Sequence, residues 1–258
     1  MAVRGMSTSL CGFIILALLI LVKPAGADTF FMQVTHSDPV TTMGQTQPEK
    51  NDTSIVWLAK DRACMMSPGR SAVIVRVDKG MIYMVDYEGK KYSVMPLEDF
   101  GNIKKMAGIE DDDEAAEMAE AMQGMAAAMM TIKMKVTPTD ETKKIKQWNA
   151  RKYMVEMTMP MGTNKSEMWA SDEIDIDLDL YRTVTSMSML QMPGFAEAMK
   201  EMEKVKGIAV LSLDEAQMMG TTIKSTTELV GFSKKAAPAG IYDVPEGFKK
   251  AEMIQRTE

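Results

Sequence analysis

The chain has 258 residues, of which 46% are hydrophobic, and a formal net charge of −6. This length and composition are sufficient for one well-filled core, and the negative charge argues against nucleic acid as a partner. Methionine is unusually frequent, with 29 residues against 7 Phe, 6 Tyr and 3 Trp. Much of the apolar surface is therefore long, unbranched and polarizable, and such side chains adapt to irregular surroundings.

The N-terminus has the three parts of a secretory signal peptide. Arg4 precedes an apolar run over residues 10–22, and small residues follow up to Ala27. The run is shorter than the about 20 residues that a membrane-spanning helix needs. We therefore expect cleavage near Ala27, and a mature chain in the periplasm or otherwise secreted. Residues 1–27 contain Arg4 and Lys23 but no acidic residue, so cleavage changes the net charge from −6 to −8.

Residues 28–258 are predicted to form a single domain, because no long linker rich in Pro, Gly or Ser divides them. Short apolar runs with period-two alternation, separated by turn residues, predict an antiparallel β protein. The polar segment 36–52 is predicted to be a loop, and a turn is expected around Pro138. The expected strands cover residues 28–35, 54–60, 72–77, 81–86, 91–95, 132–136, 144–148, 153–161, 168–170, 174–180, 205–213 and 221–232.

Two segments have the periodicity of helices. Residues 110–130 carry methionines at spacings of four, three and four, and residues 195–204 carry Phe195, Met199 and Met202, with Gly207 as the expected stop. Two helices among these many strands predict an α+β, mainly antiparallel fold: an open, strongly curved sheet, or incomplete β-barrel, capped by helices.

Several segments resemble the periplasmic lipoprotein-carrier (LolA-like) superfamily, and more narrowly its uncharacterised branch. The resemblance rests on residues 57–62, 74–86, 91–92, 166–169 and 238–250. It implies helices that lie as a lid in the concave face of an unclosed sheet, over a hydrophobic cavity for acyl chains. Arg62 and Arg70 are the candidates for the basic residue that latches this lid. The chain departs from the branch before Tyr153, where members often carry a Cys.

The methionines allow three interpretations: packing within the core, a cavity that adapts to a ligand, or a thioether site for Cu(I). The copper set would be Met154, Met157, Met159 and Met161. The candidate ligand-lining residues are Met118, Met122, Met125, Met129, Val155, Met157, Met159, Met161, Trp169, Met199 and Met202.

The sequence offers little for catalysis. It lacks the nucleophile elbow, the HExxH zinc motif and the phosphate loop, and His36 is its only histidine. Cys64 is the only cysteine after residue 27, so the mature chain has no intramolecular disulfide, and an inert buried thiol is the favoured interpretation. We expect no enzyme and no cofactor.

The leading hypothesis is a periplasmic binding or carrier protein that holds a lipid, an acyl chain or another hydrophobic molecule in a methionine-rich cavity. The alternatives are a periplasmic Cu(I)-binding protein and a non-catalytic envelope scaffold. We expect a monomer whose partners are a hydrophobic small molecule, a lipid or an acylated protein, with envelope membrane proteins as further candidates.

Overall fold

The computed structural model describes residues 27–42, 45–99, 131–159, 162–189, 192–218 and 220–251. Most of them lie in strands, and two α-helices are present in this part of the chain. The strands are β1 (Asp28–Ser37), β2 (Val40–Thr42), β3 (Gln45–Gln47), β4 (Lys50–Leu58), β5 (Arg62–Ser67), β6 (Ser71–Arg76), β7 (Met81–Asp86), β8 (Lys91–Pro96), β9 (Lys133–Ile145), β10 (Trp148–Met159), β11 (Gly162–Ser171), β12 (Ile208–Met218), β13 (Thr221–Lys235) and β14 (Lys249–Lys250). The helices are α3 (Leu178–Thr185) and α4 (Phe195–Met202), with short 3-10 turns at Val77–Lys79, Leu97–Asp99 and Met187–Met189.

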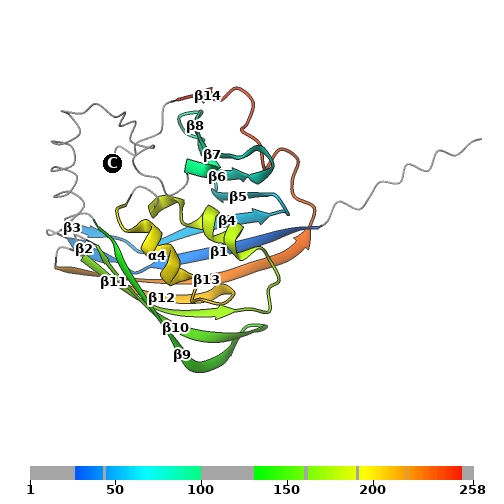
Figure 1. Cartoon of the computed structure of the whole chain (residues 1–258). Helices are drawn as coiled ribbons and strands as arrows, with labels where there is room; N and C mark the ends of the chain where they lie inside the picture. Colours follow the sequence, from blue (N-terminus) through cyan, green and yellow to red (C-terminus); the bar gives the residue numbers. More distant parts are fainter. Residues whose placement is uncertain are drawn as a thin grey trace, which may run out of the picture.

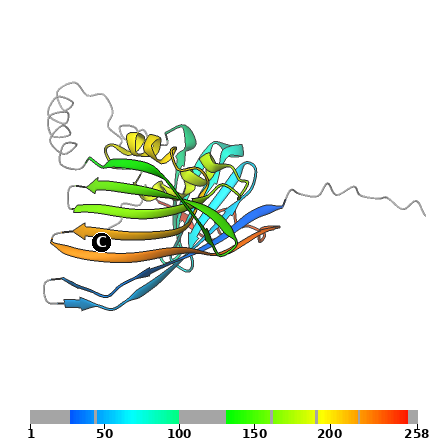
Figure 2. The ribbon, with the colours of Figure 1, turned by 90° about the horizontal axis from the view of Figure 1, so that it is seen from below.

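Within the described residues, twelve strands form one sheet in the order β14-β8-β7-β6-β5-β4-β1-β13-β12-β11-β10-β9. All neighbours are antiparallel except β14, which runs parallel to β8. The sheet curves around α3 and α4 and does not close, since β9 and β14 are its two ends (Figures 1 and 2). The prediction of an open, strongly curved and mainly antiparallel sheet with helices is confirmed.

The main core lies between the concave face of the sheet and the two helices. Phe31 and Val75 from the sheet are fully buried, as is Val184 of α3, and Phe195 of α4 is 3% exposed. The rings of Phe31 and Tyr181 lie 5.9 Å apart between centroids, which joins α3 to the centre of the sheet. Each fully buried side chain of this size contributes about 1.5–3 kcal/mol through the hydrophobic effect, so this core is what positions the helices.

The predicted strand over residues 174–180 is wrong. In this segment Asp residues alternate with apolar residues, but the segment leads into α3, which begins at Leu178. The carboxylate of Asp177 accepts the backbone N–H groups of Asp179 and Leu180 at 3.1 and 2.9 Å. Because these hydrogen bonds satisfy two donors that a helix start leaves free, the N-cap outweighs the strand-like pattern.

Two further predictions about the strands are wrong. The segment 36–52 is not a plain loop, because β1 continues to Ser37, β2 and β3 form a hairpin, and β4 begins at Lys50. Residues 132–136 and 144–148 do not form separate strands: β9 runs without interruption through Pro138, and the turn to β10 falls at Lys146, where φ is +53°. Proline is tolerated there because β9 is an edge strand.

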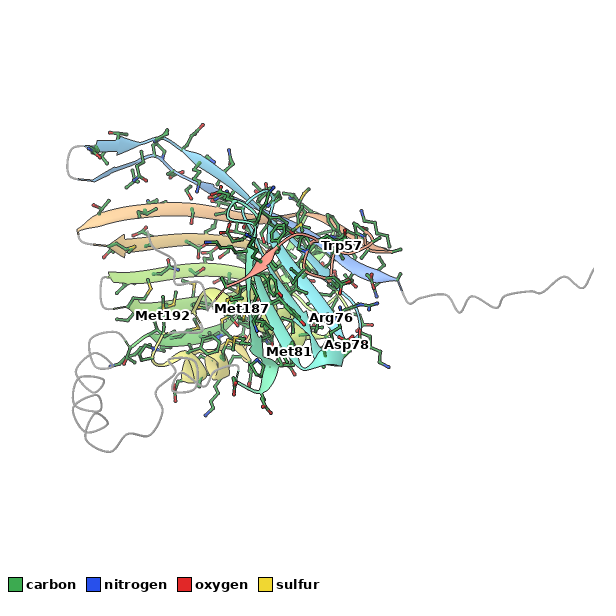
Figure 3. The ribbon with its side chains drawn as sticks, turned by 90° about the horizontal axis from the view of Figure 1, so that it is seen from above. Trp57, Arg76, Asp78, Met81, Met187 and Met192 are labelled. Carbon is green, nitrogen blue, oxygen red and sulfur yellow. The ribbon has the colours of Figure 1, made fainter. Side chains whose placement is uncertain are left out.

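The C-terminal segment 236–251 covers the opposite face of the first half of the sheet. Tyr242 is buried there with Trp57 and Cys64 in a second apolar cluster. The guanidinium of Arg76 fastens the segment: it donates to the Asp78 carboxylate at 2.7 and 2.8 Å, to the Tyr242 carbonyl at 3.1 Å and to the Asp243 carboxylate at 2.6 Å. Figure 3 shows Arg76 and Asp78 side by side at this end of the sheet. We call this arrangement the arginine clasp.

Candidate functional site

The concave face over β9, β10 and β11 carries a continuous group of methionine, valine and tyrosine side chains. Strand alternation puts Tyr153, Val155, Met157 and Met159 on one face of β10. Pairing in register places Val136 and Met134 of β9 opposite Val155 and Met157, and Met168 of β11 opposite Tyr153. We call these seven side chains the methionine band: Met134, Val136, Tyr153, Val155, Met157, Met159 and Met168.

The band passes from a buried end to a partly open end. Tyr153 and Val155 are 2% and 6% exposed, whereas Met134, Met157 and Met159 are only partly buried. Methionine has three rotatable bonds and a polarizable sulfur, so side chains with remaining free surface can change rotamer to fit different contacts. The open end therefore has the adaptable surface that is typical of binding sites for varied apolar partners.

Helix α4 covers the buried end of the band. Met202 packs against the cluster that contains Val136, Tyr153 and Val155. The carboxylate of Glu201 accepts the backbone N–H of Val136 at 2.8 Å and the ammonium of Lys204 at 2.6 Å. The hydrogen bond from Lys204, followed by that from Val136, holds the pKa of Glu201 below its usual value. The helix is thus fastened to the free edge of the sheet through a group that stays ionised at neutral pH.

The chain that follows α4 is held by the band itself. The hydroxyl of Tyr153 accepts the backbone N–H of Lys206 at 3.2 Å. Arg182 of α3 donates to the carbonyl of Val205 at 2.9 Å, which joins α3 to the segment that follows α4. Gly207, with φ at +92°, passes so close to the backbone of Ser171 that no side chain fits there. These contacts fix α4 over the band.

A shallow groove of about 530 Å³ opens between the start of β9 and α4. It begins beside the band, because Met134 lines both. Its polar rim holds Lys133, Lys200 and Glu197. Met134, one of the partly buried side chains of the band, is therefore reached from solvent along one side of α4.

The concave face becomes polar on the other side of the band. Ser166 of β11 is paired with Val155, and Asp214 of β12 is paired with Ser166. The Ser166 hydroxyl contacts the Asp214 carboxylate and lies 2.8 Å from the Ser212 hydroxyl. Asn164, which is paired with Met157, has a buried side-chain oxygen without a hydrogen-bond partner among the described residues. We call these four side chains the polar row: Asn164, Ser166, Ser212 and Asp214.

The structure brings part of the predicted ligand-lining set together. Val155, Met157 and Met159 share the band, and Met202 lies against it, whereas Met199 packs into the main core. The residues Met118, Met122, Met125, Met129 and Met161 lie outside the described residues, as does the whole predicted helix over 110–130.

Two predicted residues lie away from the band. Trp169 pairs with Lys152, and alternation along β11 turns it away from Met168; it is 4% exposed and belongs to the main core cluster, not to the cluster of Tyr153 and Val155. Its ring lies 3.9 Å from the ammonium of Lys143, and its indole N–H donates to Glu167 at 2.8 Å. Met154 is also on the opposite face, since it is an odd number of positions from Met157 and Met159. The predicted copper set is therefore divided between the two faces of β10.

The two candidate latch residues have other partners. Arg62 lies over the ring of Tyr242, with 5.1 Å between its guanidinium carbon and the ring centroid. Arg70 forms an ion pair with Asp52 on the exposed end of β4, and this bond lowers the pKa of Asp52. In the part of the chain that the structure describes, the ion-pair and ring partners of the two arginines, Asp61, Asp52 and Tyr242, lie outside α3 and α4.

Met134, Met168 and the polar row are parts of the site that were not predicted from the sequence. The alternation of Met134 with Val136 was a signal that they share one face of a strand. What the sequence lacked was the register of β9 against β10 and of β10 against β11, which decides that Met134 lies opposite Met157 and Met168 opposite Tyr153. The polar row depends on the same pairing, extended to β12.

In the described residues, no helix is long and apolar enough to cross a membrane, and no three His, Cys, Asp or Glu side chains are grouped to hold a metal ion. No family model matches the chain, and no curated protein matches it. A solved structure of PNGF-II is similar with a TM-score of 0.37 and 11% sequence identity, over 86% of this chain and 31% of that chain. The chain thus spans about a third of the PNGF-II chain, and a similarity this low carries no functional argument.

Proposed function

We propose that the protein is an exported binding or carrier protein of the periplasm that holds the apolar chain of a lipid or another hydrophobic molecule against the methionine band. The single observation that carries this proposal is the row of partly exposed methionines on the concave face, next to a helix that packs on the same row. An apolar surface of this kind, rimmed by polar side chains, is typical of a binding site.

The dimensions of the band suit an extended chain. Tyr153 and Met159 are six residues apart on β10, which at about 3.3 Å per residue corresponds to about 20 Å. Each methylene buried against this surface contributes about 0.8 kcal/mol. A ligand that reaches from the open methionines to the edge of α4 would therefore gain affinity chiefly from its apolar length.

The resemblance to the lipoprotein-carrier superfamily supports the same proposal. That resemblance implies an open curved sheet with helices in its concave face, and the chain has this arrangement. The signal-peptide pattern before Asp28 supports export. In a compartment between two membranes, apolar molecules must cross water, and a carrier provides the surface that shields them.

The test is native mass spectrometry of the protein purified from its own compartment, followed by lipid analysis of what co-purifies. A double variant, Met157→Gln with Met159→Gln, keeps side-chain length but makes the open end of the band polar. Met154→Gln is the matched control, because it changes the same strand on the opposite face. We expect the bound mass to be lost in the double variant and retained in the control. A wild-type protein that carries no ligand and binds no fluorescent fatty-acyl probe would refute the proposal.

A second candidate function is Cu(I) binding, which one observation favours. Met134 lies directly opposite Met157, and Met159 follows on the same face, so three thioethers share one surface, and soft thioether ligands select Cu(I). Replacing Met157 and Met159 by Leu keeps the surface apolar but removes two sulfurs. Copper binding, titrated against a bicinchoninate competitor, should then disappear while lipid binding survives. Unchanged copper affinity in this variant would exclude the site.

A further inference from the structure

The methionine band and the polar row form two halves of one concave surface. Met157 is paired with Asn164, and Val155 with Ser166, so each apolar side chain has a polar neighbour on the next strand. Ser212 and Asp214 continue the polar half on β12. Ser166 and Ser212 are 4% and 8% exposed, and such buried hydroxyls need hydrogen-bond partners.

The direction of the hydrogen bonds follows from counting protons. A carboxylate only accepts, so the Ser166 hydroxyl must donate its single proton to Asp214. The bond of 2.8 Å between Ser166 and Ser212 therefore uses the proton of Ser212. Both serine protons are consumed within the group of Ser166, Ser212 and Asp214. The two serines therefore have no proton left to donate to a ligand, whereas the Asp214 carboxylate retains acceptor capacity.

A second acceptor points to the same chemistry. The side-chain oxygen of Asn164 is buried and has no partner among the described residues. A buried polar atom without a partner is unfavourable until a donor reaches it. Both free acceptors lie beside the methionine band, since Asn164 adjoins Met157 directly and Asp214 is one strand further on.

The negative charge of Asp214 is not neutralised locally. Lys224 and Glu215 form an ion pair near this row. Because side chains alternate along a strand, this pair lies on the opposite face of the sheet from Asp214. Among the described residues, the ion pairs do not include Asp214. An anionic group placed beside it would be repelled, whereas an ammonium or a neutral hydroxyl would be attracted.

We infer that the ligand of the concave face is a long-chain amphiphile whose polar end donates hydrogen bonds and carries no negative charge. The apolar chain lies on the methionine band, and the polar end lies on the polar row. This inference rests on the proposed function, and it selects an amine or a hydroxylated head group over a free fatty acid.

The test compares three ligands with the same twelve-carbon chain, each below its critical micelle concentration: dodecylammonium, 1-monododecanoylglycerol and dodecanoate. Their dissociation constants are measured by displacement of a fluorescent apolar probe from the full mature chain. We expect the ammonium and the glycerol ester to bind about tenfold more tightly than dodecanoate, because a charge-assisted hydrogen bond is gained or a repulsion is avoided.

Two variants locate the effect. Asp214→Asn keeps the shape but removes the charge, and should bring the ammonium within about threefold of dodecanoate. Asn164→Leu removes the second acceptor and should weaken the glycerol ester; it also keeps the test decisive if the first variant does not fold. Glu215→Gln, the adjacent position on the opposite face, is the matched control and should leave the ranking unchanged.

The outcomes separate the two proposals. If dodecanoate binds as tightly as the other two, or if neither variant alters the ranking, the assignment of the head group is wrong while apolar binding stands. If none of the three ligands displaces the probe, or the probe itself does not bind, both the head-group assignment and the proposed function are wrong.

Discussion

Replacing Arg76 by Met should loosen the C-terminal segment from the sheet. The Arg76 side chain is 9% exposed and donates to Asp78, Asp243 and the Tyr242 carbonyl. Methionine keeps most of the apolar stem but removes the guanidinium. All three acceptors then lose the guanidinium at once, and Asp243 keeps only its longer ion pair with Lys79 at 3.6 Å. The segment that covers the cluster around Trp57 and Cys64 thus loses its main polar attachment.

The loss of unfolding free energy in Arg76→Met depends on how far water can replace the guanidinium at the three acceptors. Removing one member of a buried ion pair destabilises a protein by about 3–5 kcal/mol. Asp243 is 59% exposed and Asp78 is 30% exposed, so water can replace part of what Arg76 supplied, whereas the carbonyl of Tyr242 lies in a buried residue. We therefore expect the lower end, about 3 kcal/mol, which is a large part of a typical free energy of unfolding of 5–15 kcal/mol.

The assay is urea unfolding, followed by tryptophan fluorescence, together with limited proteolysis of the native protein. The matched control is Arg151→Met, because Arg151 is an exposed arginine on β10 and its loss changes the net charge equally. We expect a lower urea midpoint and faster cleavage within residues 236–251 for Arg76→Met alone. Equal midpoints and equal cleavage rates in the two variants would refute the clasp.

Three further predictions concern acid, the thiol and a glycine. The Arg76 guanidinium lowers the pKa of Asp78. The stabilisation by the clasp is therefore fully present above the unfolded pKa of about 4 and is lost as the pH falls through the lowered pKa. The difference in urea midpoint between wild type and Arg76→Met should narrow as the pH falls below about 4, and a constant difference would contradict this. Burial raises the pKa of Cys64 to about 12. Dithionitrobenzoate at pH 8 should therefore leave the native protein unmodified and should react with one thiol per chain in urea. Rapid reaction of the native protein would show that Cys64 is accessible. Gly207→Ala should lower the free energy of unfolding in urea by more than about 2 kcal/mol, because Gly207 has a positive φ and lies against the Ser171 backbone. Gly69 has φ at +75° but open space around it, so Gly69→Ala should lower the free energy of unfolding by about 1 kcal/mol. Equal decreases in the two variants would mean that the close approach to Ser171 is unimportant.

The parts of the fold that the sequence predicts are those with one dominant period. The alternation from Tyr153 to Met159 is unbroken, and β10 has the expected faces. The spacing of Phe195, Met199 and Met202 fits a helix and not a strand, and α4 covers these positions. In both segments hydrophobic periodicity and local propensity agree, which makes the assignment simple.

The wrong predictions fall where a local hydrogen bond or an edge position outweighs the period. Residues 174–180 alternate like a strand, but the Asp177 side chain caps α3, and residues 178–180 are therefore helical in spite of the alternation. Pro138 suggested a turn, but β9 is an edge strand. A residue of an edge strand can lack a backbone N–H without losing a hydrogen bond to a neighbouring strand, so β9 continues through Pro138. The candidate site depends on pairings between strands that are far apart in sequence, such as Ser166 with Asp214, and no single segment specifies that register.

The most direct test of the proposed binding surface is where the apolar chain of a bound ligand lies. A twelve-carbon amphiphile with a diazirine at the chain end is photolysed on the purified protein. The adducts, mapped by peptide mass spectrometry, report which side chains the apolar chain touches. We predict adducts on the face that α4 covers, at Met134, Met157, Met159 and Met202. Adducts confined to Met154, or to the C-terminal segment over Trp57, would contradict it, because those positions lie on the opposite face of the sheet.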